Sequence, residues 1–360
     1  MAAAAAATRL RWLCAQLVMF SGALGWLGYQ AGLQLEPGTA QAAASTPPAL
    51  YSIAAPAART AQVERAPASD ERETFLGMSS ERLRQRMQSG QIRSIKKNRG
   101  GSSISLRIEF SDGSRAAFKP IQSNPQTVPR KEAAAYVLSR LLGLNLVSPV
   151  VMRTVHRDEL FEKLDPASLP SRPRIERETV FDEHGKTLGA FSYWIPRVAD
   201  LRLDTTAGIH RWTEWLGQGG SIPPEKTLLM SQLSSLLIFD LLQNNSDRFS
   251  GGNLLGAPDG KTLYFMDNAF GFQADPEGHT RCWFYLHRVQ KFSLRLVQAL
   301  EGLRADALAA AMVWSRADGS QQPLLTDEEQ AALLSRRDRA LSHIDQAITM
   351  YGRENVLVFD

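Results

Sequence analysis

Hydrophobic residues recur every three or four positions over residues 228–242. This spacing predicts a buried α-helix over about residues 225–243. The helix should end at Asn244-Asn245-Ser246, a run of turn-forming residues. The same pattern predicts another helix at about residues 130–142, with Gly143 as its stop. Further helices are predicted at residues 78–87 (a short, solvated surface helix), 284–303, 304–314 and 326–351.

Strict alternation of apolar and polar residues begins at Ile104 and continues to Phe110. Alternation of this kind predicts a half-buried β-strand. Ser111-Asp112-Gly113 then favours a hairpin turn into a second strand. The remaining predicted strands are residues 114–120, 147–151, 188–198 and 261–266, and residues 156–187 are expected to form an irregular insertion.

The N-terminal region is organised differently. Residues 12–33 are apolar over about 22 positions, enough to span a bilayer. Arg9 and Arg11 precede this segment and favour a cytoplasmic N-terminus. We therefore expect a cytoplasmic tail at 1–11, a transmembrane signal anchor at 12–33, a flexible Ala- and Pro-rich stalk at 34–70 and a globular domain at 71–360. A cleavable signal peptide ending near Ala40-Gln41-Ala42 is the alternative, which the long apolar run disfavours.

The composition of the chain restricts the kinds of function that it could have. The chain of 360 residues is 44% hydrophobic and 22% charged, as in ordinary globular proteins. The net charge of +4 is compatible with an anionic ligand such as ATP, and no dense run of Lys and Arg indicates a nucleic-acid partner. Of two cysteines, Cys14 lies in the apolar segment and Cys282 in the globular part, so no disulfide is expected within that part. Zinc-ligand spacings are absent from the sequence.

Two loops carry candidate catalytic residues. Asp247 follows the break after the long helix, Asn253 comes six positions later, and Asp267 ends the predicted strand at 261–266. Phosphoryl transfer needs one carboxylate to orient the accepting hydroxyl, and a second carboxylate with a carboxamide to hold Mg²⁺ or Mn²⁺. Asp247-Arg248 taken alone is more typical of a cap or a surface ion pair, and Asp267-Asn268 of a turn. Their combination in this order favours the catalytic interpretation.

Residues upstream supply the remaining parts of a nucleotide site. Lys119 lies on the strand at 114–120, and Glu132 lies in the first turn of the helix at 130–142, beside its apolar stripe. A carboxylate at the edge of a buried face needs a partner, and Lys119 is the obvious candidate. A solvated lysine and a glutamate stabilised only by the helix dipole remain the alternatives. Gly100-Gly101 would let backbone amides approach phosphates, and Trp194 would line an adenine pocket or pack in the core.

The two loops resemble those of the secretory-pathway kinases of the four-jointed and Golgi casein kinase type. The resemblance rests on Phe239-Asp240, Asn245-Ser246-Asp247-Arg248, Asn253-Leu254 and Phe265-Met266-Asp267-Asn268-Ala269-Phe270-Gly271. Three upstream stretches are similar to the family's nucleotide-lysine strand, glutamate helix and interlobe strand, namely residues 110–120, 132–143 and 192–196. The resemblance covers roughly residues 92–300. A single cysteine in the globular part fits a distant member, such as a bacterial one, because animal relatives are rich in disulfides.

The resemblance implies an α+β, two-lobed, atypical protein-kinase-like fold. A small β-rich N-lobe would span about residues 90–195 and a mostly helical C-lobe about residues 196–360. By the resemblance, Asp247 is the catalytic aspartate, and Asp267 and Asn253 are metal ligands. Lys119 would contact the phosphates of ATP, and Glu132 would pair with Lys119 or with Mg²⁺ or Mn²⁺.

The expected function is that of an ATP- and metal-dependent kinase. Its acceptor would be a Ser or Thr hydroxyl of a secreted or membrane protein. A sugar hydroxyl on a glycan is the alternative acceptor, and an inactive kinase-like scaffold or activator is the alternative from another class. The chain would be a single-pass type II membrane protein with its domain in the Golgi or secretory lumen, or on the periplasmic side in a bacterium.

Overall fold

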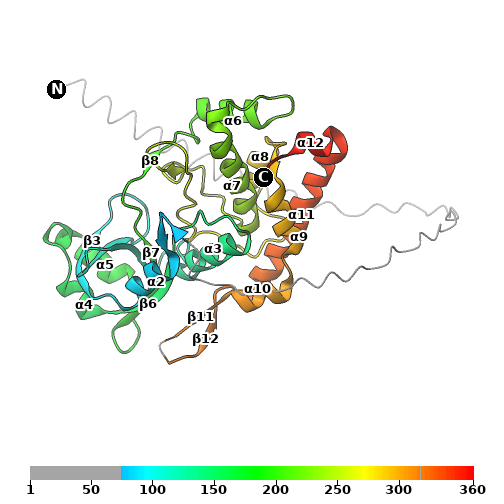
Figure 1. The fold of residues 1–360 in the computed structure, drawn as a ribbon. Coiled ribbons are helices and arrows are strands. Elements are labelled where there is room, and N and C mark those ends of the chain that lie inside the picture. Colours follow the sequence, from blue (N-terminus) through cyan, green and yellow to red (C-terminus); the bar gives the residue numbers. More distant parts are fainter. Residues whose placement is uncertain (1–73, 317) are drawn as a thin grey trace, which may run out of the picture. The chain divides into compact units, whose positions relative to one another are not determined.

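The computed structural model describes residues 74–316 and 318–360 of the chain (Figure 1). The predicted tail, anchor and stalk, residues 1–70, therefore lie outside the described residues. Among the described residues, no helix is long and apolar enough to cross a membrane.

A five-stranded antiparallel sheet forms the N-lobe, with strand order β3-β4-β5-β7-β6. The predicted alternation holds in β4, where Leu106, Ile108 and Phe110 are buried and the residues between them are partly exposed. The strands are β3 (Ile92–Lys97), β4 (Leu106–Phe110), β5 (Arg115–Pro120), β6 (Val150–His156) and β7 (Lys186–Tyr193), and a short ribbon of β1 (Thr74–Phe75) and β2 (Met78–Ser79) precedes them.

Helix α3 (Pro129–Leu141) lies next to β6 and β7 and belongs to the larger core, which it shares with the C-lobe. The second core packs Phe118 and Phe191 of the sheet against apolar residues of the segment that follows β6. That segment contains α4 (Arg157–Glu162), η2 (Pro166–Ser171) and α5 (Arg172–Glu178). The prediction of an irregular insertion at 156–187 is therefore wrong, because Leu160, Phe161 and Ile175 are buried there as helical core residues.

The predicted surface helix at 78–87 also differs from the structure. It forms as α2 (Ser80–Ser89), but Leu83 and Met87 are buried, so the helix packs on the protein instead of being fully solvated. Strand β3 follows it, in a stretch that the sequence pattern assigned no strand.

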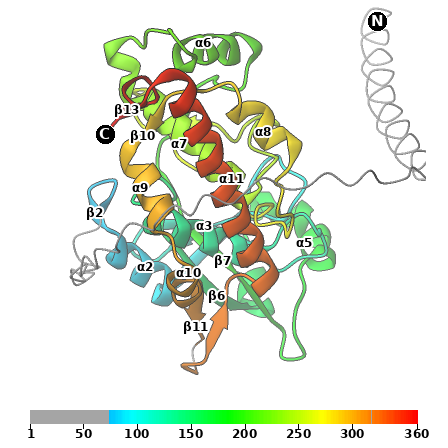
Figure 2. The ribbon, with the colours of Figure 1, turned by 90° about the vertical axis from the view of Figure 1, so that its right-hand side faces the viewer.

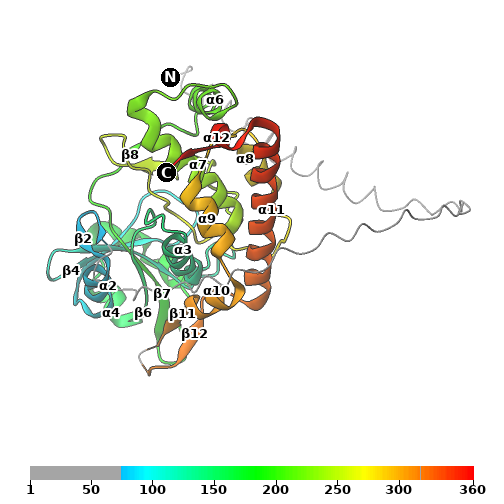
Figure 3. The same ribbon diagram turned by 45° about the vertical axis from the view of Figure 1, so that its right-hand side comes forward.

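Helix α7 (Thr227–Gln243) is the centre of the C-lobe. It is mostly apolar and is buried continuously from Leu233 to its end, as expected of a helix enclosed by others. Helices α8 (Thr280–Leu286) and α11 (Asp327–Tyr351) pack against it, and α11 runs the length of the lobe (Figures 2 and 3). The other helices are α6 (Thr206–Leu216), η3 (Pro224–Lys226), α8 (Thr280–Leu286), α9 (Leu294–Gly302), α10 (Ala305–Ala311), α11 (Asp327–Tyr351) and α12 (Arg353–Val356).

Two predicted elements of the C-lobe are wrong in detail. The helix predicted at 284–303 is interrupted because Ser293 caps a new helix, its Oγ accepting a hydrogen bond from the Leu296 amide. No regular strand forms at 261–266: Leu263 makes only an isolated antiparallel bridge with Gly256, and Phe265 donates to the Leu146 carbonyl on a different segment. Short strand pairs complete the lobe: β8 (Ala199–Asp200) with β9 (Leu255–Gly256), β10 (Phe292–Ser293) with β13 (Leu357–Phe359), and β11 (Val313–Ser315) with β12 (Gln321–Pro323).

Candidate active site

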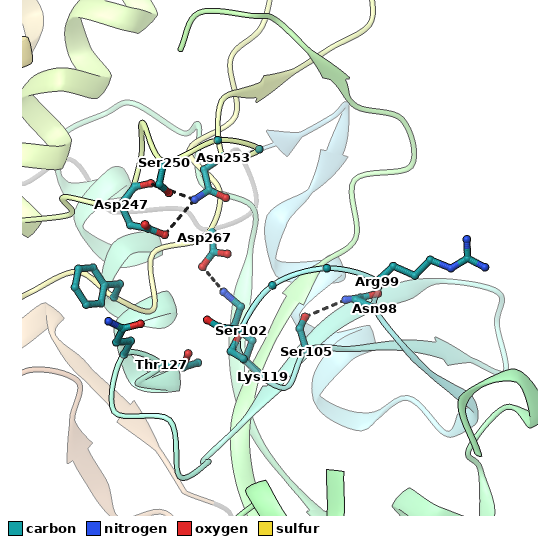
Figure 4. A pocket seen from close by; sticks show the side chains of 17 residues that line it. Asn98, Arg99, Ser102, Ser105, Lys119, Thr127, Asp247, Ser250, Asn253 and Asp267 are labelled. Carbon is teal, nitrogen blue, oxygen red and sulfur yellow. Dashed lines mark hydrogen bonds and ion pairs between the residues drawn. The ribbon is translucent and has the colours of Figure 1, made fainter. Parts of the chain in front are cut away.

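A pocket of about 570 Å³ lies between the small-residue turn after β3, strand β5 and the two loops that follow α7. Figure 4 shows Asp247 and Asn253 together at one end of it, with Asp267 drawn between them and Lys119. The structure thus brings together residues from positions far apart in the sequence. The predicted site residues that line the pocket are Gly100, Gly101, Lys119, Asp247, Asn253 and Asp267.

Lys119 links strand β5 of the N-lobe to the loop that contains Asp267. Its Nζ lies 2.6 Å from Glu132 Oε1 and 2.5 Å from Asp267 Oδ1, and its side chain is only 12% exposed. Burial favours the neutral amine, but the two carboxylates outweigh burial and raise the pKa of Lys119 above its usual range. Lys119 in turn lowers the pKa of Asp267. Lys119 and Asp267 are therefore both charged at neutral pH.

Glu132 connects α3 to the loop that contains Asp267. Its side chain is 5% exposed, and its second oxygen, Oε2, accepts a hydrogen bond from the Asn268 amide at 3.2 Å. A backbone hydrogen bond from the Val128 amide to the Ala269 carbonyl, 3.1 Å long, adds a second link next to the first. The first turn of α3 and the Asp267 loop are consequently held as one unit.

Asp247 is an exposed residue of the loop that follows α7. The Asn253 side-chain amide donates to the Asp247 carboxylate at 3.4 Å and to its backbone carbonyl at 3.3 Å. Ser250 Oγ donates to the same carbonyl at 2.6 Å, which closes the loop on itself. The carboxylate faces the pocket, where it could accept a proton from an incoming hydroxyl.

A buried polar network holds together the loop that contains Asp247 and the loop that contains Asp267. Arg248, 1% exposed, donates to both carboxylate oxygens of Asp240 and to Asn268 Oδ1 at 2.8 Å. It also donates to the carbonyl of Met266. Asp247-Arg248 is therefore not a surface ion pair, because Arg248 points into the core while its neighbour faces the pocket. Asp240 is a structural acceptor, and its carboxylate receives side-chain donors from Arg248 and Gln243.

The backbone of Asp267 adopts a left-handed conformation, with φ of +57°. Few residues other than glycine adopt this conformation, which costs about 1 kcal/mol or more and is found mainly where surrounding contacts impose it. Here those contacts include the hydrogen bond from Asn245 Nδ2 to the Asp267 carbonyl, 3.2 Å long. The strained backbone directs the carboxylate into the pocket, where its side chain is 51% exposed.

The donor set at this end of the pocket suits a hard divalent cation. Asp267 offers carboxylate oxygens and Asn253 a carboxamide oxygen, the ligand types that Mg²⁺ and Mn²⁺ prefer. Within residues 74–316 and 318–360, no cluster of three or more His, Cys, Asp or Glu side chains could hold a metal alone. A cation bound here would therefore take further ligands from phosphate oxygens or water, as in phosphoryl-transfer sites.

Trp194 is not among the residues that line the pocket. Its ring instead stacks with the Arg107 guanidinium, 5.6 Å from the ring centroid, and its amide donates to the Arg115 carbonyl at 3.0 Å. Lining residues that the sequence did not single out include Gln126 and Thr127 before α3, and Phe270 after Asp267. These residues lie in loops next to residues that were predicted. No spacing in the sequence indicates that they line the pocket.

Comparison with known proteins tests the fold independently. No protein-family model matches the chain, and no curated protein matches it by sequence. Solved structures do match. The Golgi casein kinase with Mn/ADP bound superposes with a TM-score of 0.60 at 16% identity, over 78% of this chain and 78% of that one. The chain has the fold of this kinase.

Hydra Fam20 with sugar is a second structural neighbour, with a TM-score of 0.60 at 17% identity over 77% of this chain and 91% of that one. Another structure of the Golgi casein kinase gives a TM-score of 0.61 at 16% identity. These matches confirm the predicted α+β kinase-like fold and the resemblance from which it was predicted. At this level of identity they establish the fold, and the function must be argued from the site.

Proposed function

We propose that the protein is a phosphotransferase that uses ATP and Mg²⁺ or Mn²⁺ to phosphorylate a hydroxyl group. The arrangement of Lys119 between Glu132 and Asp267, in a pocket that also contains Asp247, is the observation that carries the proposal. A buried ammonium bound to two carboxylates, beside exposed acidic groups and glycine amides, suits phosphates with a bound cation better than a neutral ligand.

Each residue then has a distinct task. Lys119 would contact the nucleotide phosphates, with Glu132 holding its ammonium in place. Asp267 and Asn253 would bind the cation, which neutralises charge on the phosphates when bound. Asp247 would orient the acceptor hydroxyl and take its proton. Gly100 and Gly101, both with positive φ, give the turn above the pocket a backbone that can approach phosphates closely.

The fold neighbours support the choice of cofactor and leave two acceptors. The Golgi casein kinase structure contains Mn/ADP, which favours nucleotide with a divalent cation for this pocket. We favour a Ser or Thr hydroxyl of a secreted or membrane protein as acceptor. The hydra Fam20 structure contains a sugar, which is the reason to keep a glycan hydroxyl as the second candidate. An inactive scaffold is disfavoured because Lys119, Glu132, Asp247 and Asp267 are all in place.

We also propose that residues 12–33 anchor the protein in a membrane, with the domain on the non-cytoplasmic side. Support comes from the apolar sequence of that segment and from the arginines before it. A reporter fused after residue 360 should then be detected in the lumen of the secretory pathway, or in the periplasm of a bacterium. A cytoplasmic signal would contradict the topology and leave the proposed chemistry unaffected.

Transfer of label from ATP tests the function directly. The full-length protein would be incubated with γ-labelled ATP and Mn²⁺ against a panel of peptides and glycans. Asp247→Asn should lower transfer by at least about a hundredfold, since a positioned general base typically contributes that much. Asp259→Asn, an exposed aspartate in the nearby turn, is the matched control and should retain activity. Label on a peptide supports a protein kinase, label on a glycan supports a glycan kinase, and label on neither supports an inactive scaffold.

A further inference from the structure

The first turn of α3 requires a restraint that the helix itself does not supply. Its N-cap residue, Val128, makes no side-chain capping hydrogen bond. The turn contains two consecutive cations, Arg130 and Lys131, although the N-terminal end of a helix repels positive charge. Glu132 follows directly, so any movement of this turn would displace the carboxylate that holds Lys119.

Glu329 provides this restraint from the C-lobe. Its carboxylate lies 2.6 Å and 3.0 Å from the two terminal nitrogens of Arg130, and 3.4 Å from Lys131 Nζ. Arg130 also donates to the Leu324 carbonyl at 2.5 Å. Lys131 is only 4% exposed, and a buried cation of this kind is strongly unfavourable without an anionic partner. One carboxylate therefore neutralises both cations of the turn.

The same carboxylate is fixed within α11. Glu329 Oε2 accepts from the Thr326 amide at 2.9 Å, and the Glu329 amide donates to Thr326 Oγ1 at 3.2 Å. These two bonds form a capping box at the start of the longest helix of the C-lobe. Glu329 is thus oriented by one lobe and bound by the helix that contains Glu132. Figure 3 shows the lower end of α11 close to α3 and α10.

We propose that Glu329 is a positioning residue: it locks the first turn of α3 to the C-lobe, so that Glu132 stays bound to Lys119 and the Asn268 amide without a ligand. The lock joins side chains of this chain alone, so it needs no modification or partner to form. This proposal rests on the proposed function only where it predicts an effect on nucleotide binding. Its effect on the position of α3 holds for any function of the pocket.

Two substitutions separate the lock from the capping box. Glu329→Gln removes the charge that binds Arg130 and Lys131, yet glutamine preserves a capping box. Thr326→Ala removes the cap and leaves the charges. Amide hydrogen exchange without nucleotide should accelerate at Asn268 by at least about tenfold in Glu329→Gln, because Glu132 no longer accepts its hydrogen bond steadily. In Thr326→Ala, acceleration should be confined to the start of α11.

Binding of ADP with Mn²⁺, measured by calorimetry on the full chain, gives the second readout. Affinity should fall about tenfold in Glu329→Gln and stay within about twofold in Thr326→Ala. Arg130→Gln, at a partly exposed position, should give the same pattern more weakly, and serves if Glu329→Gln does not fold.

Unchanged exchange at Asn268 in both Glu329→Gln and Arg130→Gln would overturn the proposal. So would equal losses of affinity in Glu329→Gln and Thr326→Ala, since these would reflect general destabilisation. Accelerated exchange at Asn268, in a protein that binds no nucleotide even as wild type, would support the lock and refute the proposed function instead.

Discussion

Removing the charge of Lys119 while keeping the length of its side chain, as Lys119→Met does, should destabilise the fold by about 3 kcal/mol. Breaking one side of a buried ion pair costs roughly 3–5 kcal/mol, because it leaves an uncompensated charge. The low end applies here, since Glu132 keeps the hydrogen bond from the Asn268 amide. Asp267 adds little to the cost, because its half-exposed carboxylate remains solvated.

Adding Glu132→Gln to Lys119→Met tests the origin of this loss. Glutamine keeps an acceptor for the Asn268 amide and removes the stranded charge. The double variant should therefore be more stable than Lys119→Met alone by about 1–2 kcal/mol, although it carries more substitutions. Lys186→Met, an exposed lysine on β7 of the same sheet, is the matched control and should change stability by less than about 0.5 kcal/mol.

Urea unfolding monitored by tryptophan fluorescence measures these differences. With a slope of about 3 kcal/mol per molar, a loss of 3 kcal/mol lowers the midpoint by about 1 M. A midpoint for Lys119→Met within about 0.3 M of wild type would refute the reasoning, since it would mean that Glu132 is not buried against Lys119. A double variant less stable than Lys119→Met would do the same.

Two further predictions concern the buried network and pH. Asp240→Asn should cost about 3 kcal/mol in urea unfolding, because it strands the buried Arg248 guanidinium, and a loss below about 1 kcal/mol would count against that pair. The pKa of Lys119 is raised, so its contribution to stability is present below the usual pKa of 10.5 and is lost as pH rises through the folded-state value. The pKa of Asp267 is lowered, so its contribution is present above 3.8 and is lost as pH falls through the folded-state value. The midpoint difference between wild type and Lys119→Met should thus be constant from about pH 8 to 10, and a slope in that range would contradict the raised pKa of Lys119.

Patterns with a strong local signal were predicted well. Helix α7 was expected at 225–243 and spans Thr227–Gln243, because an apolar helix with a clear stop is defined by its own sequence. Helix α3 and strands β4 and β5 lie within a few residues of their predicted bounds for the same reason. The contact between Lys119 and Glu132 was also inferred correctly, since a carboxylate beside a buried stripe needs a partner.

Features that depend on tertiary packing were missed. The buried role of Arg248 was not predicted, because its partner, Asp240, lies eight positions earlier on a buried helix, and no local sequence pattern links residues at that spacing. The helices after β6 are only six or seven residues long, too short for a periodicity to emerge, and two of the three contain proline. The lock between Arg130, Lys131 and Glu329 joins positions about 200 residues apart, and nothing in either segment indicates the other.

The most direct test of the central claim is the affinity of the full-length protein for ADP with and without Mn²⁺, in wild type and Asp267→Ala. If Lys119, Glu132, Asp247 and Asp267 surround one nucleotide and its cation, Mn²⁺ should tighten ADP binding to the wild type at least about tenfold. The gain should vanish in Asp267→Ala. An ADP affinity that is independent of Mn²⁺, or a gain that survives the loss of Asp267, would contradict the account.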